Sequence, residues 1–268
     1  MMQVQGNADV GNYMTRDPVS LSNSATLQDA VDIMAEKGIG NLVVTNGASI
    51  GILTEREILD NLHAFGKIPD RLLGDIMLRQ FKKVSPKTSI TQATRTMIST
   101  KTRLLVYESD KLVGIITTSD LAKAFFRTTE GNPSLKKVVS KRVYSIESFS
   151  PVLEAVRMMD TKRIGSVIVN VKGLHDRIFT ERDLLTKILN RNVDLAKEVG
   201  DYCSKFLMTA RMGIGARDAA KLMIANGIKR LPLTNNGKIV GIVTARDVVE
   251  CFIGQPNVEG IKGGDPMC

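Results

Sequence analysis

The sequence contains few of the residues on which several kinds of functional site depend. It has no tryptophan, and its four tyrosines and eight phenylalanines form no stripe with basic residues of the kind that single-stranded nucleic acid binders use. Its two histidines, His63 and His175, have no Cys or His at metal-ligand spacing. No serine or cysteine is accompanied by a recognisable base and orienting group. We therefore expect neither catalytic residues nor a metal site.

Long apolar runs and cysteine pairs are absent too. No apolar run approaches the roughly 18 residues that a membrane span needs, and no basic segment followed by an apolar one opens the chain. The three cysteines, Cys203, Cys251 and Cys268, are far apart and form no CxxC pair. This pattern is typical of a reducing compartment without a disulfide framework, so we expect a cytoplasmic protein that does not contact membranes.

The chain is basic, with a net charge of +9 and a pI of about 9.5. Residues 1–128 hold 15 Lys/Arg against 13 Asp/Glu, whereas residues 129–268 hold 22 against 15. Such a field favours anionic partners, whether nucleotide phosphates, nucleic acid or acidic protein surfaces. A basic surface that serves only solubility is the alternative.

One short motif occurs four times, as "GILTEREIL", "GIITTSDLA", "RIFTERDLL" and "GIVTARDVV". The intervals between its threonines are 63, 63 and 64 residues; the threonines are Thr54, Thr117, Thr180 and Thr244. An acidic residue follows each threonine by three positions: Glu57, Asp120, Asp183 and Asp247. A threonine N-cap with an acidic residue at this spacing is a capping box, so the motif also has a purely structural interpretation.

The repeat extends on both sides of this motif. Ahead of it lies a helical face with spacing i, i+3, i+4, i+7, such as Leu27, Ala30, Val31 and Met34, whose methionine is interpreted as a core residue. A short apolar strand and a polar turn come next. Each repeat opens with a short segment, here called its lead-in: "VGNYM", "LGDIM", "LKKVV" or "VGDYC". The pattern therefore predicts the order β-α-β-β-α in each repeat. We expect a loose Gly/Pro-rich tail at 254–268, after repeats at residues 10–63, 73–128, 135–190 and 199–253.

A single repeat of about 63 residues has a marginal hydrophobic core, so each repeat is expected to pair with its neighbour. The polar stretch at residues 127–134, "RTTEGNPS", is the expected boundary between two such pairs. The first repeat would then pair with the second, and the third with the fourth.

These residues resemble the CBS domain, named after cystathionine β-synthase, over residues 10–253. Two CBS repeats in tandem form a Bateman module, and four in one chain are similar in layout to the γ regulatory subunit of AMP-activated protein kinase. The resemblance implies an α/β fold of four repeats in two modules. It also implies binding of adenine nucleotides (AMP, ADP or ATP), and in some members S-adenosylmethionine, in clefts between paired repeats.

In the family, the motif aspartate accepts hydrogen bonds from the ribose hydroxyls, and the Ser/Thr lies near the ribose and phosphate. The resemblance assigns these roles to three pairs: Thr117 with Asp120, Thr180 with Asp183, and Thr244 with Asp247. The chemistry is suitable, because a carboxylate can accept both protons of a vicinal diol and a helix N-terminus favours phosphate. Glu57 replaces the aspartate beside Thr54, so that site is expected to be empty or structural. Arg177 replaces the motif glycine in the third repeat, which casts doubt on any close approach of a ligand there.

Two further sets of positions could contact phosphate. Between the motif threonine and acid stand Arg56, Ser119, Arg182 and Arg246, which suit phosphate binding or a solvated helix surface. At the strand before the motif, the resemblance assigns phosphate-facing roles to Arg103 in the second repeat and to Lys229 and Arg230 in the fourth. The odd repeats have Gly40 and Gly165 there. Solvated strand-edge cations are the alternative.

The sequence thus predicts a non-catalytic nucleotide sensor that acts on an unidentified regulated protein. A homodimer or an internal disc of four repeats is expected. A nucleic-acid-binding regulator driven by the basic second half, and an S-adenosylmethionine sensor, remain alternatives. Because the repeats occupy residues 10–253, we expect no enzyme domain beside them.

Overall fold

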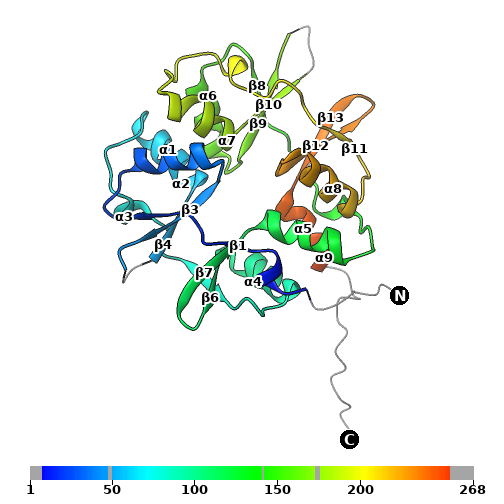
Figure 1. Ribbon diagram of the computed structural model, residues 1–268. Helices are drawn as coiled ribbons and strands as arrows, with labels where there is room; N and C mark the ends of the chain where they lie inside the picture. Colours follow the sequence, from blue (N-terminus) through cyan, green and yellow to red (C-terminus); the bar gives the residue numbers. More distant parts are fainter. Residues whose placement is uncertain (1–7, 48–49, 141, 173–175, 254–268) are drawn as a thin grey trace, which may run out of the picture. The chain divides into compact units, whose positions relative to one another are not determined.

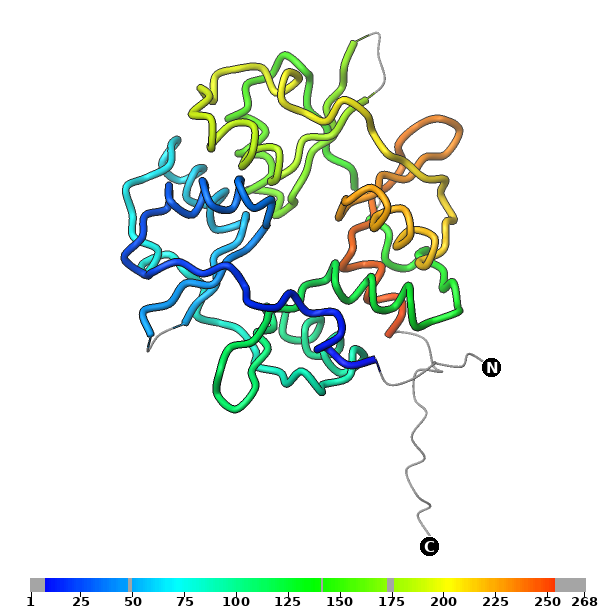
Figure 2. The backbone as a smooth tube through the Cα atoms, in the orientation of Figure 1, coloured from blue at the N-terminus to red at the C-terminus, as the bar shows by residue number. Residues whose placement is uncertain are grey.

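The computed structural model describes residues 8–47, 50–140, 142–172 and 176–253 (Figure 1). The expected loose tail at 254–268 and His175 lie outside these residues. The chain forms two compact units: unit 1 contains Met1–Arg16, Lys82–Arg142 and Thr209–Cys268, and unit 2 contains Asp17–Phe81 and Val143–Met208. Unit 1 therefore holds the motifs of repeats two and four, and unit 2 those of repeats one and three. Figure 2 shows how each unit is assembled from stretches that are distant in the sequence.

Unit 2 consists of two three-stranded sheets and their helices. Its first repeat contains β2 (Ser20–Ser22), α1 (Leu27–Lys37), β3 (Asn41–Thr45), β4 (Ile50–Thr54) and α2 (Glu55–Phe65), and is followed by α3 (Leu73–Ile76). Its third repeat contains β8 (Ser145–Glu147), α6 (Val152–Thr161), β9 (Ser166–Asn170), β10 (Arg177–Thr180) and α7 (Glu181–Asp183). The chain continues from α7 as a π-helical turn, η3 (Leu184–Ile188), and 3-10 turns η4 (Leu189–Arg191) and η5 (Val199–Asp201). The sheet orders are β2-β3-β4 and β10-β9-β8.

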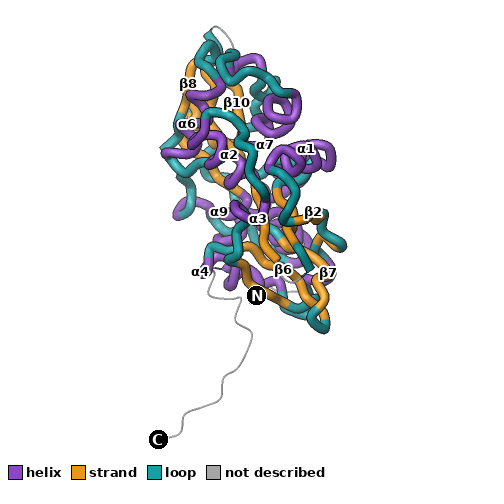
Figure 3. Tube along the Cα trace, turned by 90° about the vertical axis from the view of Figure 1, so that its left-hand side faces the viewer, coloured by secondary structure: helices purple, strands orange, loops and turns teal. Residues whose placement is uncertain are grey.

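Unit 1 has the corresponding elements of repeats two and four. The second repeat contains β5 (Phe81–Val84), α4 (Ile90–Thr100), β6 (Arg103–Glu108), β7 (Lys111–Ile116) and α5 (Thr118–Thr128). The fourth contains β11 (Ala210–Arg211), α8 (Ala216–Asn226), β12 (Arg230–Asn235), β13 (Lys238–Thr244) and α9 (Ala245–Ile253). Short segments η1 (Val10–Asn12), β1 (Thr15–Arg16) and η2 (Leu135–Lys137) complete the unit. The β-α-β-β-α order predicted for every repeat is confirmed, and Figure 3 shows these helices and strands joined by loops.

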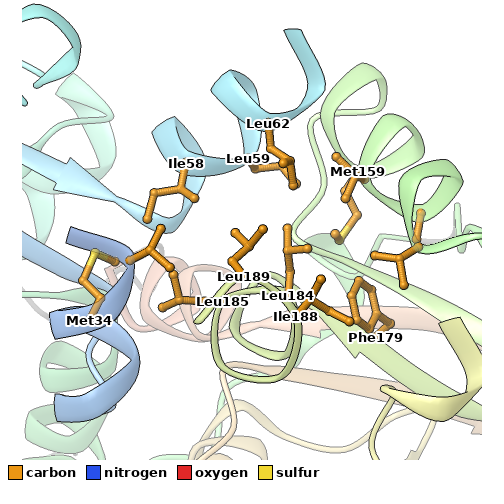
Figure 4. Close-up of a cluster of buried hydrophobic side chains, with 14 of the residues drawn as sticks. Met34, Ile58, Leu59, Leu62, Met159, Phe179, Leu184, Leu185, Ile188 and Leu189 are labelled. Carbon is orange, nitrogen blue, oxygen red and sulfur yellow. The ribbon is translucent and has the colours of Figure 1, made fainter. Parts of the chain in front are cut away.

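Each unit has its own hydrophobic core between helices of its two repeats. In unit 2, Ile58, Leu59 and Leu62 of α2 lie in one buried cluster with Leu184 and Leu185 of η3 (Figure 4). In unit 1, helices α5, α8 and α9 contact one another, and the Phe125 and Phe252 rings stack with centroids 4.9 Å apart. The repeat methionines are buried, which confirms their interpretation as core residues: Met34, Met97, Met159 and Met223.

The lead-ins of consecutive repeats are exchanged. The lead-in of repeat one packs on repeat two, where β1 pairs antiparallel with β7, whereas Leu78, just after the lead-in of repeat two, pairs with Ile52 of repeat one. In the same way Ser140 pairs with Ile242, and the Ser204 N–H donates to the Ile178 carbonyl at 2.9 Å. Repeats one and two, and repeats three and four, are therefore linked by reciprocal segments, although each compact unit contains alternate repeats.

This exchange explains the motif glycines. A Cβ atom on Gly51 would lie 2.5 Å from Met77 Sδ, and one on Gly241 would lie 2.7 Å from Val139 Cγ1. Each contacted side chain is the last residue of an exchanged lead-in. The glycine thus leaves room for protein atoms rather than for a ligand. In repeat three, Arg177 replaces the glycine, and the lead-in ends in the smaller Cys203.

The expected boundary at residues 127–134 lies inside unit 1 and is an ordered connection. The Pro133 carbonyl accepts a hydrogen bond from the Ala216 N–H at 2.8 Å, and Asn132 Oδ1 accepts one from the Arg217 N–H at 2.9 Å. The segment therefore caps the first turn of α8, whose N-cap residue, Gly215, has no side chain to do so. Polar composition predicted a linker, but these polar groups satisfy a helix end.

Candidate functional site

All four motifs form the same capping box at the junction of a strand and a helix. One carboxylate oxygen accepts hydrogen bonds from both the threonine hydroxyl and the threonine N–H, at 2.7 and 2.7 Å for Asp247. The hydroxyl distances for the other three acids are 2.6 Å for Glu57, 2.7 Å for Asp120 and 2.6 Å for Asp183. The capping interpretation is therefore confirmed. Asp29 of α1 makes the same box with Thr26, so the choice of aspartate does not by itself mark a ligand site.

The second oxygen of each motif aspartate distinguishes the repeats. Among the described residues, Oδ1 of Asp120 and Oδ1 of Asp247 have no hydrogen-bond or ion-pair partner. Oδ1 of Asp183 lies 2.7 Å from Lys187 Nζ. Both aspartates of unit 1 thus retain an acceptor after capping their helices, whereas both oxygens of Asp183 are in use.

The motif arginines of unit 2 contact protein groups, in a reciprocal arrangement. Arg56 of repeat one lies 2.9 Å from the Glu181 carboxylate of repeat three and donates to the Ile164 carbonyl at 2.8 Å. Arg182 of repeat three lies 3.4 Å from the Glu55 carboxylate of repeat one and donates to the Gly38 carbonyl at 2.7 Å. These contacts bind the two repeats of unit 2 together. The phosphate-binding role predicted for Arg182 stays a prediction, with its guanidinium already engaged.

Unit 1 has only part of this arrangement. Arg246 donates to the Ile98 carbonyl of repeat two at 3.2 Å, and Ser119 stands at the corresponding position of repeat two. No acidic side chain in the described residues pairs with Arg246. Its guanidinium therefore has fewer fixed partners than those of Arg56 and Arg182.

The predicted cationic strand residues stand opposite the motif threonines. In the register of β12 and β13, Arg230 pairs with Thr244, and the neighbouring Lys229 carbonyl accepts the Ala245 N–H at 2.9 Å. Arg103 begins β6 beside the Leu104–Ile116 pair, one step from Thr117. In unit 2 the residues opposite Thr54 and Thr180 are the neutral Asn41 and Ser166. The structure thus places a cation next to each motif of unit 1 and none at these positions in unit 2.

Charge is divided unequally between the units. Unit 1 holds 22 Lys and Arg residues against 10 Asp and Glu residues, a net charge of +12, whereas unit 2 holds 15 against 18, a net charge of −3. The sequential halves concealed this contrast because each half contributes repeats to both units. An anionic ligand is therefore favoured electrostatically by unit 1.

A polar network in unit 2 joins α2 to the end of α6. The His63 ring hydrogen-bonds the Asp160 carboxylate, and Arg163 lies 3.2 Å from Asp60 and 3.1 Å from Asp160. Burial and a hydrogen bond with Asp160 raise the pKa of Asp60. Burial also acts to raise the pKa of Asp160, but hydrogen bonds from His63 and Asp60 outweigh it, so this pKa lies below its usual value. His63 is a partly buried member of this network.

The described cysteines are buried thiols. Burial, with the nearby Asp247 and Glu250 charges, raises the pKa of Cys251 to about 11. Burial also raises the pKa of Cys203, against the effect of a hydrogen bond with Arg177. Within the described ranges, no group of three or more His, Cys, Asp or Glu side chains could hold a metal ion. In the same ranges, every helix is too short or too polar to cross a bilayer.

The family model for the CBS domain matches residues 10–64, 73–127, 135–190 and 199–254. The uncharacterised protein MJ1225 of Methanocaldococcus jannaschii is 27% identical over 186 residues, which are 62% of this chain and 66% of that protein. An uncharacterised 33.4 kDa protein in a ribosomal RNA operon of Thermofilum pendens is 28% identical over 194 residues, 66% of this chain and 63% of that protein. The aligned stretches thus span just under two-thirds of these relatives' lengths.

Two solved structures share the fold over nearly the whole chain. The crystal structure of MJ1225, a candidate archaeal homologue of g-AMPK, has a TM-score of 0.76 at 18% identity and covers 91% of this chain and 100% of that one. A conserved protein from Pyrococcus horikoshii has a TM-score of 0.63 at 19% identity, covering 90% and 98%. At these identities the likeness shows the fold alone.

Proposed function

This chain belongs to the CBS domain family, and on that premise we propose that it is a non-catalytic regulatory protein that binds adenine nucleotides. Members of this family are typically regulatory and bind adenosine ligands. The observation that carries the proposal is the second carboxylate oxygen of Asp120 and of Asp247, which stays without a partner in the described residues while the first oxygen caps the helix. A ribose presents two adjacent hydroxyl donors, and an ionised carboxylate oxygen accepts them in strong charge-assisted bonds.

The surroundings of these aspartates support binding of the phosphates. Helices α5 and α9 begin at the motif threonines, so their N-termini provide partial positive charge. Arg103 in repeat two, and Lys229 with Arg230 in repeat four, stand beside those threonines in the sheets. The net charge of +12 on unit 1 adds a long-range attraction for AMP, ADP or ATP.

A regulatory role requires that the nucleotide binds one conformation of the protein better than another. Occupancy would then change the affinity for a regulated protein by the same coupling free energy. The homodimer expected from the sequence is one equilibrium that nucleotide binding could shift. Light scattering with and without nucleotide would measure the fraction of dimer.

Isothermal titration with AMP, ADP, ATP and S-adenosylmethionine tests the proposal. We expect binding of at least one adenine nucleotide, and loss of binding in the double variant Asp120→Asn/Asp247→Asn, whose amides can still accept the capping hydrogen bonds. Preferential binding of S-adenosylmethionine would instead support the alternative that the protein is an S-adenosylmethionine sensor. Absence of heat for all four ligands at millimolar concentration would contradict the proposal.

The charge of unit 1 also favours a second candidate, a nucleic-acid-binding regulator. Lys136 and Lys137 are exposed on η2 in this unit. Binding to labelled RNA or DNA should then weaken steeply with salt, and Lys136→Glu/Lys137→Glu should weaken it further. The matched control is Lys162→Glu/Lys205→Glu, which changes two exposed lysines of unit 2 by the same charge. Equal effects of the two pairs, or no binding at physiological salt, would exclude this candidate.

A further inference from the structure

Repeat three has the same threonine, arginine and aspartate as repeat four, here Thr180, Arg182 and Asp183, yet their surroundings differ from those in repeats two and four. Asp183 uses Oδ2 to cap the helix and Oδ1 to bind Lys187 at 2.7 Å. The corresponding residues four positions after the other motif acids are Asn61, Ala124 and Cys251. Within the part of the chain that the structure describes, repeat three alone has a cation four residues after its motif acid that forms an ion pair with it.

Lys187 is held more firmly than an ordinary surface lysine. Its Nζ donates to the Tyr202 carbonyl at 2.9 Å and to the Cys203 carbonyl at 3.3 Å, in addition to Asp183. An ammonium group has three donors, and these three acceptors use all of them. The Lys187 side chain is 36% exposed and the Asp183 side chain 14% exposed, so the pair is shielded from full solvation. A ribose that displaced Lys187 would have to break this set of bonds.

The backbone of repeat three brings Lys187 to these acceptors. The residues after Asp183 form the π-helical turn η3, which the motif helices of the other repeats lack within the described part of the chain. The acceptors Tyr202 and Cys203 belong to the exchanged lead-in of repeat four, which packs on repeat three. The π turn and the lead-in together make Lys187 a bridge from the motif to the neighbouring segment.

We propose that Lys187 closes the motif of repeat three to nucleotide, so that only repeats two and four bind it. The inference rests on the proposed function and names which of its repeats act. Two independent features agree with it. Ser166 replaces the cation opposite Thr180, and the net charge of unit 2 is −3, which disfavours an anionic ligand. Lys187 is thus a specificity-determining residue that does not itself contact the ligand.

The stoichiometry of AMP binding, measured by titration calorimetry on the full chain, tests this assignment. The wild type should bind two AMP molecules per chain. Asp183→Asn should leave that number and the affinity unchanged. Lys187→Met should release Asp183 Oδ1 and raise the number to three, and Lys187→Met/Asp183→Asn should return it to two. Thermal melts check that each variant is folded, and Lys187→Gln replaces Lys187→Met if the methionine variant is not.

The outcomes separate this inference from the proposed function. No AMP binding by the wild type, with none for the other nucleotides, contradicts the proposed function itself. Three sites in the wild type would overturn the statement that only repeats two and four bind. Fewer sites or weaker binding in Asp183→Asn would show that repeat three already binds nucleotide. Either result would overturn the inference alone. A number that stays at two in both folded Lys187 variants would overturn the role of Lys187.

Discussion

The Arg56 guanidinium of repeat one lies 2.9 Å from the carboxylate of Glu181 in repeat three, and the Glu181 side chain is only 8% exposed. Arg56 also donates to the Met159 and Ile164 carbonyls at the end of α6. Truncation of Arg56 removes this ion pair and both carbonyl hydrogen bonds, which are charge-assisted and partly buried. We expect Arg56→Ala to lower the free energy of unfolding by about 2–3 kcal/mol.

Arg246→Ala is the matched control for that change, since Arg246 occupies the same motif position in unit 1 but, among the described residues, donates one hydrogen bond, to the Ile98 carbonyl. We expect it to cost about 1 kcal/mol. Urea unfolding curves of both variants provide the comparison. A larger loss for Arg246→Ala than for Arg56→Ala would contradict the structural role given to the unit 2 arginines.

The motif glycines should tolerate no side chain, because exchanged lead-ins occupy the space. In Gly241→Val, the new Cβ would meet Val139 Cγ1 at 2.7 Å and the Ser140 carbonyl oxygen at 3.1 Å. We expect a loss of about 1–3 kcal/mol from overpacking, measured by urea unfolding. A variant as stable as the wild type would show that the lead-in is not held against this strand.

The pKa shifts of Asp60 and Asp160 have opposite signs, so the two carboxyl groups contribute to stability with opposite pH dependences. The lowered pKa of Asp160 contributes stability that is present above its unfolded pKa, near 3.9, and is lost as pH falls through the folded value. The raised pKa of Asp60 has the opposite sign, and its contribution is lost as pH rises through the folded value. At pH 7, Asp160→Asn should therefore cost about 0.5–1 kcal/mol, a modest value because the groups are partly exposed, and Asp60→Asn less.

Urea unfolding at pH 7, 5 and 3 measures this difference. The gap between Asp160→Asn and the wild type should shrink as pH falls below about 4, because the unfolded chain takes up the proton there while the native carboxyl, with its lowered pKa, is protonated only at still lower pH. A gap that widens as pH falls, or a larger loss for Asp60→Asn than for Asp160→Asn at pH 7, would refute the assignment of charges in this network.

Cys251 should be inert in the native protein. Its pKa of about 11 leaves almost no thiolate at pH 8, and its side chain is buried. Iodoacetamide at pH 8, followed by peptide mass spectrometry, should modify Cys251 only after denaturation. Rapid native alkylation would mean that the end of α9 is open in solution.

The repeat order, the buried helix faces and the capping boxes could be predicted from the sequence, because each is marked by residue types at short, regular spacings. The exchange of lead-ins could not. A lead-in such as "LGDIM" has the same position in the sequence whether it packs on its own repeat or on the previous one, so nothing in the sequence indicated that Leu78 pairs with Ile52. The charge contrast between the units was hidden for the same reason.

The candidate site was predicted in part. Position and residue type identified the motif threonines and acids, but not which carboxylate oxygens remain available. The i, i+4 spacing of Asp183 and Lys187 was the visible signal for the ion pair, whereas the π turn and the Tyr202 carbonyl that fix Lys187 belong to the tertiary structure. The sequence suggested that the motif arginines bind phosphate. Their actual acceptors in the protein, such as the Gly38 carbonyl, are more than 100 residues away in the sequence and could not be foreseen.

The central claim is that Asp247 binds a ligand as well as capping α9, and Asp247→Glu tests it most directly. Glu57 makes the same capping box in repeat one, so the variant should fold and melt within about 2 °C of the wild type. Its longer side chain moves the second carboxylate oxygen, and titration calorimetry should show AMP affinity at one site reduced about tenfold. Unchanged affinity at every site in this folded variant would contradict the account and leave Asp247 as a helix cap alone.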